Sequence, residues 1–191
     1  MFLEQFPEDG KYRGWIEVIC GSMFSGKTEE LIRRLRRVEF AGQELLLFKP
    51  RIDIRFSKEN VVSHNGATFE AIQVDSAKEI LEHWKNQRIV AIDETQFFDE
   101  GIVQVANHLA ANGVRVICAG LDMDFQAKPF GPMPFLMSSA EYVTKVHAIC
   151  VSCGNLAQFS HRKTKEQVQV LVGAVEEYEP LCRMCYNKIK Y

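Results

Sequence analysis

The sequence lacks the features that mark membrane, secreted and nucleic-acid-binding proteins. No apolar run approaches the roughly 18 residues of a membrane-spanning helix. The N-terminus carries Glu4, Glu8 and Asp9 instead of a basic region followed by an apolar one, which argues against a secretory signal. A net charge of −2 gives no overall field that favours DNA or an anionic membrane. We therefore expect a cytoplasmic protein with neither nucleic acid nor a membrane as partner.

The chain has enough apolar residues for a real core. Its 191 residues are 47% hydrophobic, which suits one domain with a small addition. No internal repeat or low-complexity tract interrupts it. We expect a flexible leader over residues 1–13, a larger domain over 14–145 and a smaller C-terminal domain over 146–191.

One stretch fits the phosphate-binding loop G-x-x-x-x-G-K-[ST] at every fixed position: Gly21, Ser22, Met23, Phe24, Ser25, Gly26, Lys27 and Thr28. Its glycines let backbone N–H groups surround phosphates, its lysine reaches the β- and γ-phosphates, and its threonine offers a hydroxyl to Mg²⁺. A strand-like run precedes the loop and a helical pattern follows it, which disfavours a chance glycine turn. The stretch predicts a nucleotide-binding protein.

Short apolar runs alternate with helical patterns along the first two thirds of the chain. Strands are expected at 15–20, 44–49, 88–94 and 114–120, with helices at 27–41, 76–85 and 101–111. This alternation is typical of parallel strands joined by crossover helices, with active groups at the carboxyl ends of the strands. The predicted fold class is α/β, with a P-loop (RecA-like) parallel sheet, a small C-terminal zinc-binding domain and a substrate-covering loop. After Leu121 the chain is expected to form a loop rich in aromatic and turn residues.

The third predicted strand ends in two carboxylates, Asp93 and Glu94. Asp93 is placed to hold Mg²⁺ together with Thr28, whereas Glu94 is the better candidate for a general base. Because neighbouring side chains of a strand point to opposite faces, the two acids are expected to serve different purposes. A pair of solvated strand-end acids is the alternative.

The residues alone leave the phosphoryl acceptor open. A small-molecule kinase is favoured because five phenylalanines follow strand ends, where a planar base could stack: Phe97, Phe98, Phe125, Phe130 and Phe135. One alternative is an ATPase in which Glu94 activates water. Another is a zinc-ribbon nucleic-acid-binding protein, supported only by Arg33, Arg34, Arg36 and Arg37, which we interpret instead as a solvated helix face.

Two C-x-x-C pairs near the C-terminus predict a structural zinc site: Cys150 with Cys153, and Cys182 with Cys185. All four tetrahedral positions would be filled, so the metal would close a long loop and not catalyse. Cys20 and Cys118 lie in apolar strands and are expected in the core.

Together these motifs resemble the zinc-containing thymidine kinase family of the cytosolic type. The resemblance rests on the phosphate loop, on Asp93-Glu94-Thr95-Gln96-Phe97-Phe98, on Gly120-Leu121-Asp122-Met123-Asp124-Phe125 and on the cysteine pairs, and it covers roughly Arg13 to Asn187. It implies transfer of the γ-phosphoryl group of ATP to the 5′-hydroxyl of thymidine, in the nucleotide salvage that supplies DNA synthesis. It also implies a homotetramer inhibited by thymidine triphosphate.

The resemblance also implies roles for particular residues. Glu94 would be the base. Nucleotide contacts would come from the phosphate loop and from Asp53, Ile54, Arg55, Asp93, Glu94, Thr95 and Gln96. Nucleoside contacts would come from Met23, Leu121, Phe125 and Tyr178, and from a loop whose backbone contacts thymine: Gln169, Val170, Leu171, Val172 and Gly173.

Overall fold

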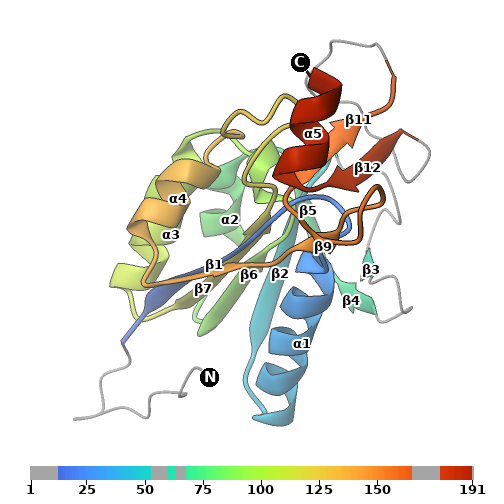
Figure 1. Cartoon of the computed structure of the whole chain (residues 1–191). Coiled ribbons are helices and arrows are strands. Elements are labelled where there is room, and N and C mark those ends of the chain that lie inside the picture. The colour runs from blue at the N-terminus through green and yellow to red at the C-terminus, as the bar shows by residue number, and fades with distance from the viewer. Residues whose placement is uncertain (1–12, 53–59, 63–67, 165–176, 191) are drawn as a thin grey trace.

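The computed structural model describes residues 13–52, 60–62, 68–164 and 177–190. Six parallel strands form its central sheet in the order β5-β2-β6-β7-β1-β8 (Figure 1). The strands are β1 (Trp15–Cys20), β2 (Leu45–Pro50), β5 (Ile72–Val74), β6 (Ile89–Ile92), β7 (Arg115–Gly120) and β8 (Tyr142–Lys145). In the described part of the chain, no helix has the length and apolar character needed to cross a membrane.

Helices cover both faces of the sheet and create two cores. One face packs against α1 (Lys27–Phe40), and the other against α2 (Ala77–His83), α3 (Gly101–Ala111) and α4 (Met133–Ser139), as Figure 1 shows. Successive strand residues divide between these faces: Ile89 and Ala91 pack on the α1 side, whereas Val90 and Ile92 pack on the α3 side. This two-sided burial explains why the strands are continuous apolar runs in the sequence.

A C-terminal module, which we define as residues 148–164 and 177–190, follows the edge strand β8 along the chain. It contains the antiparallel pairs β9 (Ala148–Ile149) with β10 (Leu156–Ala157) and β11 (Phe159–Arg162) with β12 (Tyr178–Leu181), followed by α5 (Arg183–Lys190). It has its own small core, which includes Phe159 stacked on Tyr186 with ring centroids 4.6 Å apart. The short antiparallel pair β3 (Asn60–Val62) and β4 (Thr68–Glu70) completes the described strands.

The sequence-based prediction of an α/β fold with a parallel sheet is confirmed, but two features differ from expectation. The sheet has six strands, whereas the sequence predicts four long ones, because the short strands β5 and β8 join its two edges. Strand β5 lies within a stretch from Val61 to Val74 that the sequence predicts to be rich in β-structure, but β8 was not expected. The segment after Leu121 also contains α4, which was expected to be loop. Its prolines lie at the N-terminal end, where a missing N–H breaks no helical hydrogen bond.

A buried charge cluster joins α1 to the centre of the sheet. Glu17 on β1 is fully buried and receives Arg34 Nη1 at 2.5 Å and Arg115 Nε at 2.7 Å. Arg34 also donates to Thr144 on β8 at 2.9 Å. The prediction of a solvated arginine face is therefore wrong for Arg34, although the other three arginines are exposed. An acidic partner on β1 was not visible from helical spacing alone.

Replacing Glu17 with glutamine is expected to destabilise the fold by about 3 to 5 kcal/mol at pH 7, because two guanidinium groups lose their buried counter-ion. Burial opposes ionisation of Glu17, but Arg115, Trp15 and Arg34 outweigh it and hold its pKa below the ordinary 4.5. The carboxylate therefore contributes fully above pH 4.5, and its contribution is lost as the pH falls through the lowered pKa. Urea denaturation from pH 3 to 8 should show a difference from the unmodified protein that shrinks only at the acidic end. Glu39→Gln, on the exposed side of α1, is the matched control and should change little.

Candidate active site

The phosphate loop connects β1 to α1 through backbone conformations that few residues adopt. Gly21 and Gly26 have φ values of +148° and +83°, and Phe24 has a φ of +63° although it is not glycine. A Cβ at Gly21 would lie 2.2 Å from the Val146 carbonyl oxygen, so only glycine fits beneath the chain that follows β8. The conformation of the loop is therefore restricted by the chain that packs over Gly21.

The phosphate loop brings hydrogen-bond donors together at the N-terminus of α1. Gly26 is the N-cap of α1 and no side chain caps this helix, so its first turn presents N–H groups to an anion. Lys27 Nζ and Ser25 Oγ donate to the Ser22 carbonyl oxygen at 2.8 and 2.7 Å, which keeps the lysine ammonium against the loop. An ammonium beside a helix N-terminus suits the phosphates of a nucleoside triphosphate.

Asp93 and Glu94 lie just beyond the carboxyl end of β6, which ends at Ile92. The predicted strand, 88–94, extended two residues too far at this end. The inference that the two acids alternate across a strand is therefore wrong, because Glu94 has left-handed dihedral angles of 50° and 40°. Its N–H bonds the Asp93 carboxylate at 2.9 Å, and a 3₁₀ turn over Thr95–Phe97 follows. The turn, not strand alternation, gives the carboxylates different directions.

The side chains of Thr95 and Gln96 are directed inward. Thr95 is fully buried and its hydroxyl donates to the Ile92 carbonyl oxygen at 3.0 Å. The Gln96 amide nitrogen donates to the Glu94 carboxylate, and its oxygen accepts the Leu121 N–H at 2.9 Å. Both residues were expected to contact the nucleotide, and in this structure their side chains bond to groups within the protein.

Phe125 and Tyr178, the two aromatic residues expected to contact the nucleoside, are joined by Arg162. The guanidinium of Arg162 lies 3.7 Å from the Phe125 ring centroid and donates to the Tyr178 hydroxyl at 2.5 and 3.0 Å. Arg162 is 5% exposed. Reasoning from the sequence missed this residue, since a lone arginine after a predicted irregular segment carries no pattern.

The C-terminal module contacts the phosphate loop directly. Ser160 Oγ accepts the Met23 N–H at 2.9 Å, and Phe24 packs against the core of the module. Tyr186 adds a hydrogen bond from its hydroxyl to the Phe125 carbonyl oxygen at 3.0 Å. Ser160 is a second residue that sequence patterns did not reveal. Through these contacts, the folded module supports both the phosphate loop and the predicted nucleoside pocket.

Of the five phenylalanines considered for base stacking, two belong to the main core or its rim. Phe98 and Phe130 are each 7% exposed, and Phe130 makes an edge contact with Phe97 at 5.7 Å between centroids. Phe135 is 56% exposed on α4. Phe125 is linked through Arg162 to Tyr178, the other aromatic residue expected at the nucleoside. Cys20 and Cys118 are buried, as expected, and burial raises the pKa of the Cys118 thiol to about 12.

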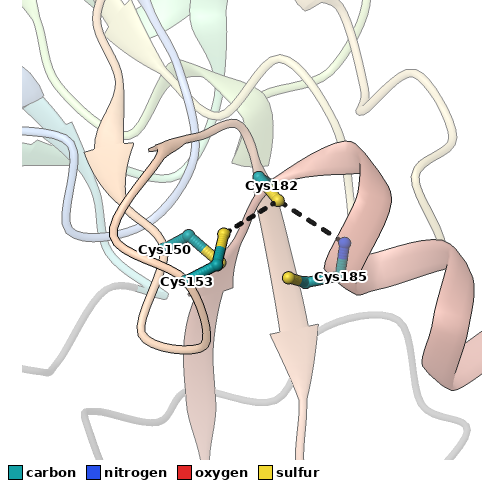
Figure 2. A group of neighbouring side chains, drawn as sticks. All are labelled: Cys150, Cys153, Cys182 and Cys185. Atoms are coloured by element: carbon teal, nitrogen blue, oxygen red, sulfur yellow. Dashed lines mark hydrogen bonds between the residues drawn. The ribbon is translucent and has the colours of Figure 1, made fainter.

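The four module cysteines converge from three elements (Figure 2). Cys150 and Cys153 flank the turn between β9 and β10, Cys182 follows β12, and Cys185 lies in the first turn of α5. All four sulfur atoms lie within 4.8 Å of one another, and those of Cys153 and Cys182 are 3.5 Å apart. Four thiols at this spacing match the donor set of a tetrahedral zinc site.

The protonation of these thiols also fits a metal. Hydrogen bonds from Asn155, first from its backbone, lower the pKa of Cys153 to about 6, whereas bonds with Cys153 and Cys182 raise that of Cys185 to about 12. The Cys153 thiolate therefore forms easily, whereas ionisation of Cys185 is opposed. A divalent cation is what allows four neighbouring thiols to ionise together.

Two groups of predicted site residues lie outside the described residues: Asp53, Ile54 and Arg55, and the loop from Gln169 to Gly173. The remaining predicted residues fall into three groups at the carboxyl ends of the strands and beside the module. These are the phosphate loop, the Asp93–Gln96 turn with Leu121, and Phe125 with Tyr178.

The fold and phosphate loop define the class as a P-loop nucleotide-binding protein. A family model described as thymidine kinase matches residues 14–186. The chain is 56% identical over 190 residues to a thymidine kinase of Bacteroides thetaiotaomicron, with 100% of this chain and 96% of that protein covered. It is 55% identical over 186 residues to a thymidine kinase of Porphyromonas gingivalis, with coverage of 97% and 91%.

The chain therefore belongs to the thymidine kinase family, and the resemblance inferred from its motifs is confirmed. Its class is that of a kinase, a transferase that uses ATP. Among solved structures it is also similar to the flagellar accessory protein FlaH of Methanocaldococcus jannaschii, with a TM-score of 0.48 and 12% identity over 90% of this chain and 88% of that chain. That likeness is too distant to bear on function.

Proposed function

We propose that the protein transfers the γ-phosphoryl group of ATP to the 5′-hydroxyl of thymidine, and of deoxyuridine, forming the 5′-monophosphate. The observation that carries this proposal is the identity of 56% to a thymidine kinase across the whole chain. The phosphate loop is complete in sequence and in backbone form, which supports ATP as the donor.

Different residues act on the phosphates of ATP and on the attacking hydroxyl group. Lys27 and the N-terminus of α1 bind the phosphates and stabilise the negative charge that grows on them during transfer. Glu94 accepts the proton of the 5′-hydroxyl as that oxygen attacks the γ-phosphorus, and ADP leaves. Thr28 and Asp93 would hold Mg²⁺, which supplies charge neutralisation between the phosphates.

The thymidine pocket is proposed to lie between the Asp93–Gln96 turn and the C-terminal module. Met23, Leu121, Phe125 and Tyr178 would line it, and the backbone of 169–173 would contact the thymine edge. The link from Phe125 through Arg162 to Tyr178 supports this placement, because it joins a loop after β7 to the module. The division into a leader (1–13), a nucleotide-binding domain (14–145) and a zinc-binding domain (146–191) belongs to the same proposal, as do the nucleotide contacts of Asp53, Ile54 and Arg55.

Further properties are proposed from the resemblance alone. They are a homotetrameric assembly, inhibition by thymidine triphosphate, and a cytoplasmic location.

The deciding experiment measures ATP consumption with Mg²⁺ in the presence of thymidine, deoxyuridine, deoxycytidine, deoxyadenosine or no acceptor. Turnover confined to thymidine and deoxyuridine is the expected result. Equal turnover without an acceptor would mean that water is the nucleophile, as in an ATPase. A Lys27→Met variant should lack turnover in every reaction, which shows that the signal comes from this phosphate loop.

A further inference from the structure

The Glu94 carboxylate is bonded by the side chain of a nearby residue, Gln96. Glu94 has the left-handed backbone conformation that non-glycine residues seldom adopt, and it begins a short 3₁₀ turn. The backbone of this turn does not by itself fix the carboxylate, which lies at the end of two flexible methylene groups. A base that must meet one hydroxyl proton needs its carboxylate fixed by something else.

The Gln96 side chain supplies that support. Its amide nitrogen donates to Glu94 Oε2, and its amide oxygen accepts the backbone N–H of Leu121 at 2.9 Å. These partners settle which way the amide points, because a carboxylate only accepts and a backbone N–H only donates. The two bonds connect the end of β6 to the end of β7 through one amide.

The surroundings of Gln96 leave it little freedom. The residue is 2% exposed. A Cβ at Gly120 would lie 2.7 Å from Gln96 Oε1, and a Cβ at Gly131 would lie 2.4 Å from the Gln96 carbonyl oxygen. Two glycines therefore make the space that Gln96 occupies, and the packed neighbours prevent its amide from turning away.

We infer that Gln96 is a positioning residue, which holds the Glu94 carboxylate for the phosphoryl transfer and ties it to the backbone of Leu121. This inference rests on the proposed role of Glu94 as the base. It differs from a nucleotide-contacting role for Gln96, since both ends of the amide are used inside the protein. Leu121 belongs to the predicted nucleoside pocket, so the same bridge places the base relative to the acceptor.

The test is a double-mutant cycle between Gln96→Met and Glu94→Gln. Methionine keeps the length and bulk of glutamine but makes neither hydrogen bond. In the otherwise unmodified enzyme, Gln96→Met should lower kcat by a factor of about 10 to 100 and leave ATP affinity nearly unchanged, because a misplaced base slows the step without removing a phosphate contact. In the Glu94→Gln background the same substitution should change the residual rate less than about threefold, because the carboxylate that it positions is gone.

A second variant tests the inference if Gln96→Met does not fold. Gln96→Glu keeps the acceptor for the Leu121 N–H but sets a second carboxylate against Glu94, and it should also lower kcat. Thermal melting and titration with ATP are measured for every variant. Gln104→Met, on the exposed side of α3, is the matched control and should leave all parameters unchanged.

Three results would overturn the inference. The first is that Gln96→Met leaves kcat intact, the second is that it lowers ATP affinity instead, and the third is that it lowers the rate equally in both backgrounds. If Glu94→Gln itself retained full turnover, the proposed base would fail and the inference with it. A strong effect of Glu94→Gln with no effect of Gln96→Met would remove the inference alone.

Discussion

Glu94→Gln is expected to lower turnover with thymidine by a factor of about 10² to 10⁴, because an amide cannot accept the proton of the attacking hydroxyl. Glutamine has the size of glutamate and keeps an oxygen for the Gln96 amide, so the 3₁₀ turn should persist. ATP affinity should stay near normal, since the phosphate contacts come from the loop before α1. Steady-state turnover and titration with ATP measure the two effects separately.

The matched control for this prediction is Glu100→Gln, an exposed glutamate at the start of α3 that should retain full turnover. Unchanged turnover in Glu94→Gln would remove Glu94 as the base. A parallel fall in ATP affinity would instead assign this carboxylate to nucleotide binding.

Removal of the metal from the cysteine site is expected to abolish thymidine binding and to weaken ATP binding less. The core of the C-terminal module is small, so the metal supplies much of its folding free energy. The module must be folded to place Tyr178 and Arg162 and to keep the hydrogen bond from Tyr186 to Phe125. The phosphate loop loses one hydrogen bond, from Met23 to Ser160, but keeps its support from the sheet.

This prediction is measured by titrating thymidine and ATP into protein treated with a strong chelator, and again after zinc is added back. Circular dichroism reports the loss of the module independently of activity. Cys182→Ser should reproduce the effect of chelation, whereas Met184→Ser, an exposed change between two of the cysteines, should not. Equal loss of both ligands would count against a selective role for the module in thymidine binding.

The parts of the fold that could be predicted are those determined by residues close together in the sequence. Strand β1 and helix α1 begin at the predicted residues, because a buried strand and an amphipathic helix each have a distinct apolar period. Gly42 follows the C-cap residue Ala41, and its φ of +65° gives the left-handed turn in which glycine commonly ends a helix. The four cysteines were found for the same reason, since C-x-x-C spacing is a local property.

The parts that were missed depend on partners far away in the chain. Arg34 looks solvated in its helix until Glu17 is placed beside it on β1. The helix α4 was hidden by its prolines, which usually mark loops. The bridge through Gln96 needs Leu121, which lies in another βα loop and carries no sequence signal for this contact.

The order of the sheet also constrains how the protein is made. Among the described strands, β1 leaves the ribosome first, yet its neighbours in the sheet are β7 and β8. Residues 21–114 must therefore be synthesised before β1 has any strand to pair with, and the hydrogen bond from Met23 to Ser160 spans 137 positions. Such distant pairings fold slowly and leave apolar strands exposed in the nascent chain. The phosphate loop, although encoded near the start, is among the last parts of the site to be completed.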